Sequence, residues 1–341
     1  MRTKFPSIIL LALFVLSPVS SQARGKYDNT DTLVVARDGS GEFRTVSEAV
    51  EVCRAFMEYT KVIYVKKGIY KEKLVVPSWL TNIEIIGEDR DETIITFDDH
   101  ANVKIPKIGL ESTLQLQDPN KDGLQTMGTF RTYTVKVEGC HITFRNLTIE
   151  NQAPRKGQAV ALHTEGDCLR FVNCRFLGNQ DTIYTGMANT RLYFEDCYIE
   201  GTTDFIFGPS TAWFEGCTIH SKINSYITAA STPKDVKYGY VFNNCTLTAA
   251  EGVDKVFLGR PWRAYAYTLF MNCDLGKHIV PEGWQNWKDY HDPAQEGTVR
   301  YQEYNNSGAG ANPQQRVAWS KQLSKKEIKE ITIENVLNGW K

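Results

Sequence analysis

Beyond its first two dozen residues, this chain of 341 residues has no apolar run long enough to cross a membrane. It also lacks an excess of charge of either sign, because 39 Lys and Arg residues are balanced by 40 Asp and Glu residues. No long basic run occurs, so nucleic acid is not an expected partner. The chain also lacks a linker-like stretch, and we therefore expect residues 24–341 to form a single domain.

The one long apolar run lies at the start of the chain. Arg2 and Lys4 precede the apolar residues 8–16, and a stretch of small residues then ends at Ala23. This order is typical of a secretory signal peptide and is too short for a membrane-spanning helix. We expect residues 1–23 to be removed and the protein to be exported, either secreted or periplasmic, with no attachment to a membrane.

A six-residue pattern recurs through the middle of the chain every 20 to 28 residues. Each copy begins with Phe, has Asn, Asp or Gly in the third position, and ends with Ile, Leu or Phe. The copies begin at Phe144, Phe171, Phe194, Phe214, Phe242 and Phe270. Asn, Asp and Gly tolerate a left-handed backbone, so the third position predicts a sharp bend. Alternation on either side of the bend directs the Phe, the fourth residue and the last residue inward.

A strand–bend–strand unit of this length cannot bury its apolar side alone, so successive units are expected to stack as coils of a solenoid. An antiparallel sandwich with regular strand spacing is the alternative. It explains the strands, but not a bend residue and a Phe that keep their positions through six copies. The pattern therefore predicts an all-β chain folded as a parallel β-helix.

Three segments lie outside the repeat. Thr45 precedes apolar residues at helical spacing over residues 46–57, which predicts a short capping helix over the open N-terminal end of the solenoid. Residues 322–337 are expected to cap the other end or to pack along it. The polar residues 98–128 are expected to form a loop at the rim of a groove, with disorder as the alternative.

The chain has eight cysteines, and five of them share the fourth position of the pattern. These five are Cys174, Cys197, Cys217, Cys245 and Cys273. Side chains stacked in parallel on successive coils cannot form an unstrained disulfide. We therefore predict buried thiols that act as small apolar side chains, and the pattern leaves the state of Cys53, Cys140 and Cys168 open.

Two aspartates repeat at the spacing of the coils. Asp181 and Asp204 are 23 residues apart, as are Cys174 and Cys197, so the aspartates should lie one above the other at about 4.8 Å on a surface strand. Two carboxyl groups this close titrate as a pair, and one holds a proton near neutral pH while the other stays charged. The pair can supply one nucleophile or base and one acid.

Two glutamines and an arginine are predicted on the same face. Gln158 lies 23 residues before Asp181, and Gln180 is adjacent to Asp181; their amides can donate to an oxygen that gains negative charge. Arg260 and Asp204 each lie 13 residues before a cysteine of the pattern. Arg260 is therefore expected level with Asp204, two coils on, where it would keep that carboxylate ionised.

Aromatic residues near these positions could form a surface on which a sugar ring stacks, and the candidates are Trp262, Phe205 and Tyr184. Taken singly, each of the polar residues has an ordinary structural interpretation: a turn-forming aspartate, a salt-bridging arginine, a ladder of amides. Their convergence on one face favours a catalytic site.

Four motifs resemble those of the pectin methylesterases (pectinesterases), a family of right-handed parallel β-helix enzymes, and the resemblance extends from about residue 33 to residue 320. The motifs are Gln158-Ala159-Val160-Ala161-Leu162, Gln180-Asp181-Thr182-Ile183-Tyr184, Asp204-Phe205-Ile206-Phe207-Gly208 and Leu258-Gly259-Arg260-Pro261-Trp262. The chain departs from the family pattern beside the site, where His163, Thr203 and Ile183 replace the usual residues, which puts subsite preference in doubt more than activity.

The resemblance implies hydrolysis of the methyl esters of galacturonate units, which releases methanol and de-esterified pectin. It implies that Asp204 is the nucleophile, that Asp181 donates and then accepts the proton, and that Arg260 orients Asp204. By the same resemblance, Gln158 and Gln180 stabilise the oxyanion.

Sugar contacts are implied for Trp262 and Thr129, and Gln158 and Arg260 are further candidates for binding the chain. The implied partner is methyl-esterified homogalacturonan (pectin), with no metal or organic cofactor, and we expect the enzyme to act as a monomer.

Related β-helix proteins offer three other interpretations. A pectate lyase would need an acidic calcium site and a basic catalytic residue, and a polygalacturonase would need several carboxylates where only two align. A non-catalytic polysaccharide-binding solenoid would need the aromatic residues but not the aspartates.

Overall fold

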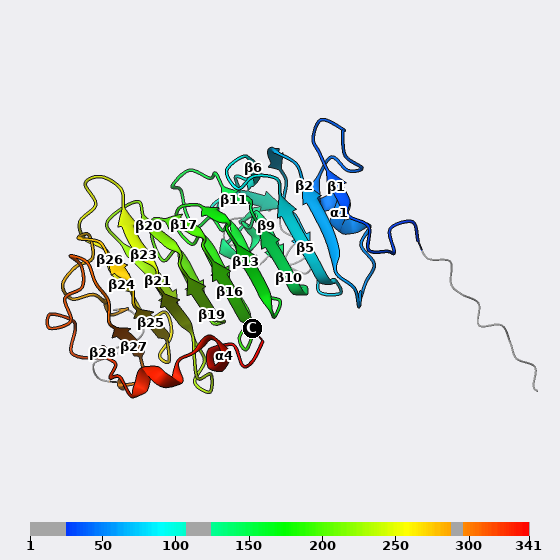
Figure 1. Cartoon of the computed structure of the whole chain (residues 1–341). Helices are drawn as coiled ribbons and strands as arrows, with labels where there is room; N and C mark the ends of the chain where they lie inside the picture. Colours follow the sequence, from blue (N-terminus) through cyan, green and yellow to red (C-terminus); the bar gives the residue numbers. More distant parts are fainter. Residues whose placement is uncertain (1–24, 107–123, 288–295, 341) are drawn as a thin grey trace, which may run out of the picture.

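The computed structural model describes residues 25–106, 124–287 and 296–340. Three sheets of parallel strands run along the molecule and enclose its core, as the stacked arrows in Figure 1 show. The predicted all-β, right-handed parallel β-helix is therefore confirmed. The predicted signal peptide lies outside the described residues, and no helix within them is long and apolar enough to span a membrane.

Each coil from β2 to β24 contributes one strand to each sheet, and parallel pairing holds throughout the three. Sheet 1 contains β1 (Leu33–Val35), β2 (Lys61–Val65), β5 (Thr81–Gly87), β10 (Cys140–Arg145), β13 (Leu169–Val172), β16 (Arg191–Glu195), β19 (Thr211–Glu215), β22 (Tyr240–Asn243), β25 (Tyr267–Met271), β27 (Arg300–Tyr304) and β28 (Lys321–Gln322). Sheet 2 contains β3 (Gly68–Lys71), β6 (Thr93–Phe97), β11 (Thr148–Asn151), β14 (Arg175–Leu177), β17 (Tyr198–Gly201), β20 (Thr218–Ser221), β23 (Thr246–Ala249) and β26 (Asp274–Leu275). Sheet 3 contains β4 (Leu74–Val76), β9 (Val135–Val137), β12 (Leu162–Thr164), β15 (Ile183–Thr185), β18 (Ile206–Gly208), β21 (Tyr226–Ala230) and β24 (Phe257–Gly259).

The third residue of each repeat forms the bend between sheet 1 and sheet 2. These residues are Asn146, Asn173, Asp196, Gly216, Asn244 and Asn272, and their φ angles lie between 49° and 62°. The predicted left-handed bend is thus confirmed in all six copies. Some of the side chains also connect neighbouring coils, as where the Asn173 amide donates to Asn146 Oδ1 at 2.9 Å.

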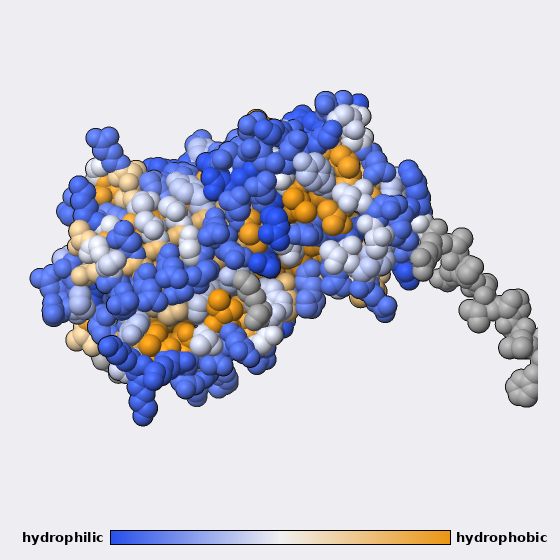
Figure 2. Space-filling view, in the orientation of Figure 1, coloured by the Kyte–Doolittle hydropathy of each residue, from blue (hydrophilic) through white to orange (hydrophobic). Residues whose placement is uncertain are grey.

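The phenylalanines of the repeat stack through the interior, as predicted. Their ring centroids lie 4.4–5.6 Å apart from Phe144 through to Phe270, and the rings are fully buried. Burial of one such side chain contributes about 1.5–3 kcal/mol to the free energy of folding. In the space-filling view, hydrophilic side chains cover most of the visible face (Figure 2), as expected when the apolar side of each strand faces inward.

The five cysteines at the fourth position of the repeat are buried and free, which confirms the prediction for them. Cys53, Cys140 and Cys168, whose state the sequence left open, are free as well. Burial raises the pKa of the Cys197 and Cys217 thiols well above the ordinary value. They therefore remain protonated and act as apolar side chains.

The N-terminal helix is shorter than predicted. Helix α1 (Val46–Glu51) begins with a capping box in which Thr45 and Glu48 bond each other's backbone, and it packs against β1, β2 and β4 at the end of the solenoid. The expected continuation to residue 57 is wrong. Phe56 has a left-handed backbone (φ 54°) and a side chain that is 74% exposed, so the chain leaves the helix before this position.

The C-terminal segment packs along the side of the solenoid, and the expectation that it covers the end is wrong. After β28 it forms the 3-10 helix η3 (Glu327–Glu330) and helix α4 (Ile333–Val336), which lies beside β19 (Figure 1). Val336 and Leu337 are buried against the outer face of sheet 1, where Tyr193 and Trp213 project. Tyr193, Trp213 and Val241 form a row of apolar outward residues on neighbouring strands, and the C-terminal segment packs against this row.

The loop predicted at residues 98–128 is described only at its two ends. These ends pair as an antiparallel hairpin of β7 (Lys104–Pro106) and β8 (Leu124–Thr126), and the 3-10 helix η2 (Thr129–Arg131) follows. Residues 107–123 lie outside the described part of the chain. The base of the hairpin is held at the side of sheet 3, because the Ala101 amide donates to the Gln158 carbonyl at 2.8 Å.

Candidate active site

Asp181 and Asp204 lie at corresponding places on adjacent coils, each two residues before a strand of sheet 3. Ile183 pairs with Ile206, and the amide of Asp181 donates to the carbonyl of Thr203 at 3.1 Å. The aspartates are in turns and not within strands, and both have left-handed backbones, with φ of 67° and 49°. Asp is one of the few residues that adopt this conformation without a large steric cost.

Both carboxyl groups are buried, with residue exposures of 8% for Asp181 and 5% for Asp204. Burial, and next the negative charge of Asp204, raise the pKa of Asp181 well above its ordinary value. Burial raises the pKa of Asp204 too, but its ion pair with Arg260 opposes that rise. The arrangement therefore favours a protonated Asp181 beside an ionised Asp204.

Arg260 binds Asp204 through two parallel hydrogen bonds. Its Nε lies 3.0 Å from Oδ1 and its Nη2 lies 2.7 Å from Oδ2. A bidentate contact of this kind fixes the orientation of the carboxylate as well as its charge.

The predicted register of Arg260 is wrong by three residues. Gly259 pairs with Thr228, which pairs with Ile206, so Arg260 begins level with Phe207 and not with Asp204. Its side chain reaches back along the strand over the coil that carries Ala229. Counting from the cysteines failed because the loop between β24 and β25, residues 260–266, makes the chain from Gly259 to Cys273 three residues longer than the corresponding chain from Ile206 to Cys217.

Gln158 and Gln180 both line the cavity that contains the two aspartates. Gln158 was predicted level with Asp181 and is one residue away from that level. It is Ala159 whose amide donates to the Gln180 carbonyl, at 3.0 Å. The same bonding pattern places Asp181 opposite Asp204, so Gln158 lies opposite Gln180. The two glutamine side chains therefore flank the aspartates from one side.

The cavity has a volume of about 220 Å³ and an opening to solvent. Its lining combines the predicted polar residues with a hydrophobic rim. The lining residues are Thr129, Phe130, Gln158, Gln180, Asp181, Asp204, Phe207, Ala229, Arg260, Trp262 and Trp287. In the described part of the chain, no group of three His, Cys, Asp or Glu side chains is placed to hold a metal ion.

Phe205 does not line the cavity, so the predicted sugar contact of this residue is wrong. Phe205 is fully buried in the main core. The alternation of strand β18 begins at Ile206, which points inward, so the outward aromatic residue is Phe207. Tyr184 lies behind the cavity wall, with its ring stacked on Phe207 at 4.7 Å and against Phe130 at 4.8 Å.

Three aromatic residues of the cavity, Phe207, Phe130 and Trp287, were not predicted from the sequence. Alternation along β18, counted from Ile206, could have indicated Phe207. Phe130 follows the hairpin and Trp287 follows the last strand of sheet 3, and both lie outside the repeat, so no spacing argument reaches them.

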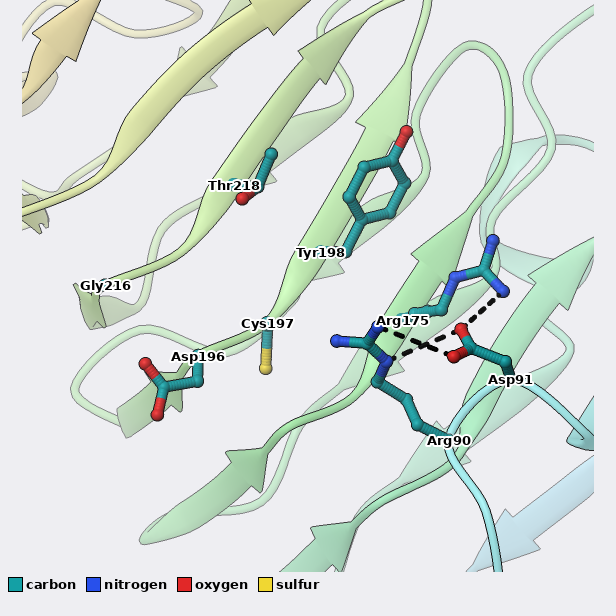
Figure 3. A pocket seen from close by; sticks show the side chains of 8 residues that line it. All are labelled: Arg90, Asp91, Arg175, Asp196, Cys197, Tyr198, Gly216 and Thr218. Carbon is teal, nitrogen blue, oxygen red and sulfur yellow. Dashed lines mark hydrogen bonds and ion pairs between the residues drawn. The ribbon is translucent and has the colours of Figure 1, made fainter.

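A second, larger depression of about 410 Å³ lies over the bend between sheets 1 and 2 and shares no residue with the first. Figure 3 shows that Asp91 lies between the guanidinium groups of Arg90 and Arg175, at 3.5 Å and 2.9 Å. Because this one carboxylate neutralises much of the positive charge, the depression has no strong preference for an anion. It also lacks a buried, unpaired carboxylate that could act in catalysis.

Comparison with known proteins places the chain among enzymes that act on pectin esters. The sequence profile described as Pectinesterase matches residues 32–340. The chain is 33% identical to the protein named Probable pectinesterase 8 of Arabidopsis thaliana, over 92% of this chain and 76% of that protein. It spans about half the length of several plant relatives whose names combine pectinesterase with pectinesterase inhibitor.

The fold is similar to solved structures over nearly its full length. Pectin methylesterase from carrot superposes with a TM-score of 0.77 and 32% identity, over 90% of this chain and 93% of that one. A pectin methylesterase in complex with a hexasaccharide superposes with a TM-score of 0.74 and 26% identity, over 91% of this chain and 97% of that one.

Proposed function

This chain belongs to the pectinesterase family, and we propose that it hydrolyses the methyl esters of galacturonate units in pectin through Asp204 as the nucleophile and Asp181 as the proton donor and acceptor. The observation that carries the proposal is the buried carboxyl pair: one member is held ionised by a bidentate arginine, and the other is driven to bind a proton. Two carboxyl groups with opposite protonation are suited to covalent acyl transfer.

In the first step, an Asp204 oxygen attacks the carbonyl carbon of the methyl ester. The negative charge that develops on the carbonyl oxygen is stabilised by the side-chain amides of Gln158 and Gln180, which line the same cavity. The bond from the acyl carbon to the methoxy oxygen then breaks, and Asp181 gives its proton to that oxygen. Methanol leaves, and the galacturonyl group remains joined to Asp204 as an acyl-enzyme.

In the second step, water attacks the acyl carbon while the ionised Asp181 takes a proton from it. The bond between the acyl carbon and the Asp204 oxygen breaks, which releases a free galacturonate carboxyl group. Asp181 is protonated again and Asp204 is again a carboxylate. Arg260 carries the compensating charge at both stages, because Asp204 leaves and regains its ionised form beside the guanidinium.

The polysaccharide would lie along the hydrophobic rim of the cavity. Trp262 and Phe207 are in contact there, with ring centroids 5.8 Å apart, and Thr129 also lines the cavity. Flat aromatic surfaces of this kind stack on the apolar face of a sugar ring. Methyl-esterified homogalacturonan is therefore the proposed partner, and the predictions of a monomer, a single domain and export by residues 1–23 stay predictions.

Methanol release tests the proposal directly. The purified protein is expected to release methanol from highly methylated pectin, with one new carboxyl group formed for each methanol and no change in chain length. Fully de-esterified pectin, as the control substrate, should release none. Chain cleavage or unsaturated products without methanol would instead indicate a hydrolase or a lyase.

The activity is expected to have a bell-shaped pH dependence. It should fall with decreasing pH as Asp204 becomes protonated, and fall with increasing pH as Asp181 loses its proton, so the two limbs report the apparent pKa values of the coupled pair. Arg260→Lys replaces the bidentate contact with a single point charge. This variant should move the acidic limb to higher pH, because the opposition to the raised pKa of Asp204 is weakened.

The matched control for that measurement is Arg263→Lys. Arg263 belongs to the same loop and lies over the Trp262 ring at 4.6 Å, but it has no contact with Asp204. The acidic limb of the pH profile of Arg263→Lys should coincide with that of the parent protein. An acidic limb that does not move in Arg260→Lys would contradict the role assigned to the ion pair.

A further inference from the structure

The guanidinium of Arg260 lies against two aromatic rings as well as against Asp204. Its Cζ is 4.2 Å from the centroid of the Tyr226 ring and 4.0 Å from that of the Trp287 ring. The two hydrogen bonds to Asp204 fix the guanidinium edge that faces the carboxylate, and the rings restrict the plane in which that edge lies. Arginine stacks on aromatic faces in this way because its delocalised cation is attracted to the π-system.

This restriction matters because Arg260 begins three residues beyond the level of Asp204 and two coils away from it. The long side chain has to cross that distance, and Ala229 on the coil between is too small to hold it in place. An unsupported arginine would sample many rotamers there. The side chains that stack on the guanidinium are therefore candidates for keeping it in its productive position.

Tyr226 is itself fixed from two sides. Its hydroxyl donates to Gln285 Oε1, and its ring stacks on Phe257 with centroids 5.5 Å apart. The backbone amide of Gln285 in turn donates to the carbonyl of Gly259 at 3.1 Å, directly before Arg260. Tyr226 thus contacts the Arg260 guanidinium through its ring and is connected through Gln285 to the backbone directly before Arg260.

We propose that Tyr226 and Gln285 are positioning residues that hold the Arg260 guanidinium against Asp204, and so keep the nucleophile ionised and correctly oriented. The inference rests on the proposed function, since it assigns no separate chemistry. Neither residue lines the cavity, so both act through Arg260 and not on the substrate.

Tyr226→Leu, which removes both the ring and the hydroxyl, tests the proposal. It is expected to lower kcat for methanol release about tenfold with KM changed less than about twofold, because the loss affects the reacting carboxylate and not the binding surface. The acidic limb of the pH profile should also move to higher pH, which a loss of packing alone would not cause.

Two milder variants remove only the hydrogen bond between Tyr226 and Gln285. They test the proposal even if Tyr226→Leu folds poorly. Tyr226→Phe keeps the ring but loses the hydroxyl, and Gln285→Leu removes the acceptor. Each is expected to lower kcat about two- to threefold, and the double variant should be no worse than either alone, because both break the same contact. Tyr198→Leu is the matched control, since Tyr198 lies beside Arg175 at 5.7 Å on sheet 2, far from the cavity.

The proposal is overturned if folded Tyr226→Leu keeps both the parent kcat and the parent acidic limb, or if only KM rises. It is also overturned if the effects of Tyr226→Phe and Gln285→Leu add fully. A failure of the proposed function would be recognised separately. In that case Asp204→Asn would still release methanol from methylated pectin, irrespective of the activities of the Tyr226 variants.

Discussion

Asp204→Asn is expected to reduce methanol release from methylated pectin by at least about 10³-fold. The neutral amide has no charged oxygen with which to attack the ester, and it removes the anion that Arg260 neutralises. The backbone at this position is left-handed, with φ of 49°, and Asn tolerates that conformation as Asp does. The loss should therefore occur in a folded protein, which circular dichroism and a thermal melt can verify.

Asp196→Asn provides the matched control. Asp196 is also left-handed, with φ of 52°, and occupies the bend between β16 and β17, but its side chain is exposed and lies outside the cavity. Its activity should equal that of the parent protein. If Asp204→Asn kept more than about 1% of the parent rate, the covalent role of Asp204 would be refuted.

Glu303→Ala is expected to lower the free energy of unfolding by about 3–5 kcal/mol, the range found when one partner of a buried ion pair is removed. Glu303 and Arg316 are joined by two hydrogen bonds of 2.7 Å and 3.1 Å, and their side chains are only 4% and 3% exposed. Truncation of the glutamate leaves a buried guanidinium without its counter-charge. Equilibrium denaturation by urea measures the change.

Glu84→Ala is the corresponding control on the same sheet. Glu84 pairs with Arg145 at 3.0 Å, but the two side chains are 26% and 37% exposed, so solvent screens the pair. Its removal should cost less than about 1 kcal/mol. Equal destabilisation by the two substitutions would show that burial of the Glu303–Arg316 pair has no special weight.

The Glu303–Arg316 pair also supports the site from a distance. Arg316 donates to the carbonyl of Pro281 at 2.9 Å, at the start of the segment that continues to Gln285 and Trp287. A weakened pair would loosen the residues that contact Tyr226 and Arg260. Glu303→Ala should accordingly lose activity at a lower temperature than Glu84→Ala.

The solenoid could be predicted because its sequence repeats the same physical constraints on every coil. A left-handed bend residue and a buried Phe recur in all six copies of the repeat and a buried thiol in five of them, and all three features are found in the structure. The two ends could not be predicted as well, because they do not repeat. The helix predicted over residues 46–57 ends at Glu51. The apolar residues keep their helical spacing beyond Glu51, but the left-handed backbone of Phe56 is incompatible with a helix.

Within the site, prediction succeeded where residues follow the coil spacing and failed where they do not. Asp181 and Asp204 stack because no insertion separates their coils. Arg260 was assigned the wrong level because an inserted loop shifts the register. Phe205 was assigned outward, although the strand alternation begins only after it.

The unpaired state of the eight described cysteines has a consequence for how the protein can be made. No cross-link has to form, so folding needs neither an oxidant nor an isomerase, and a chain retained in the reducing cytoplasm should reach the same structure. Reductants such as dithiothreitol should leave its melting temperature unchanged.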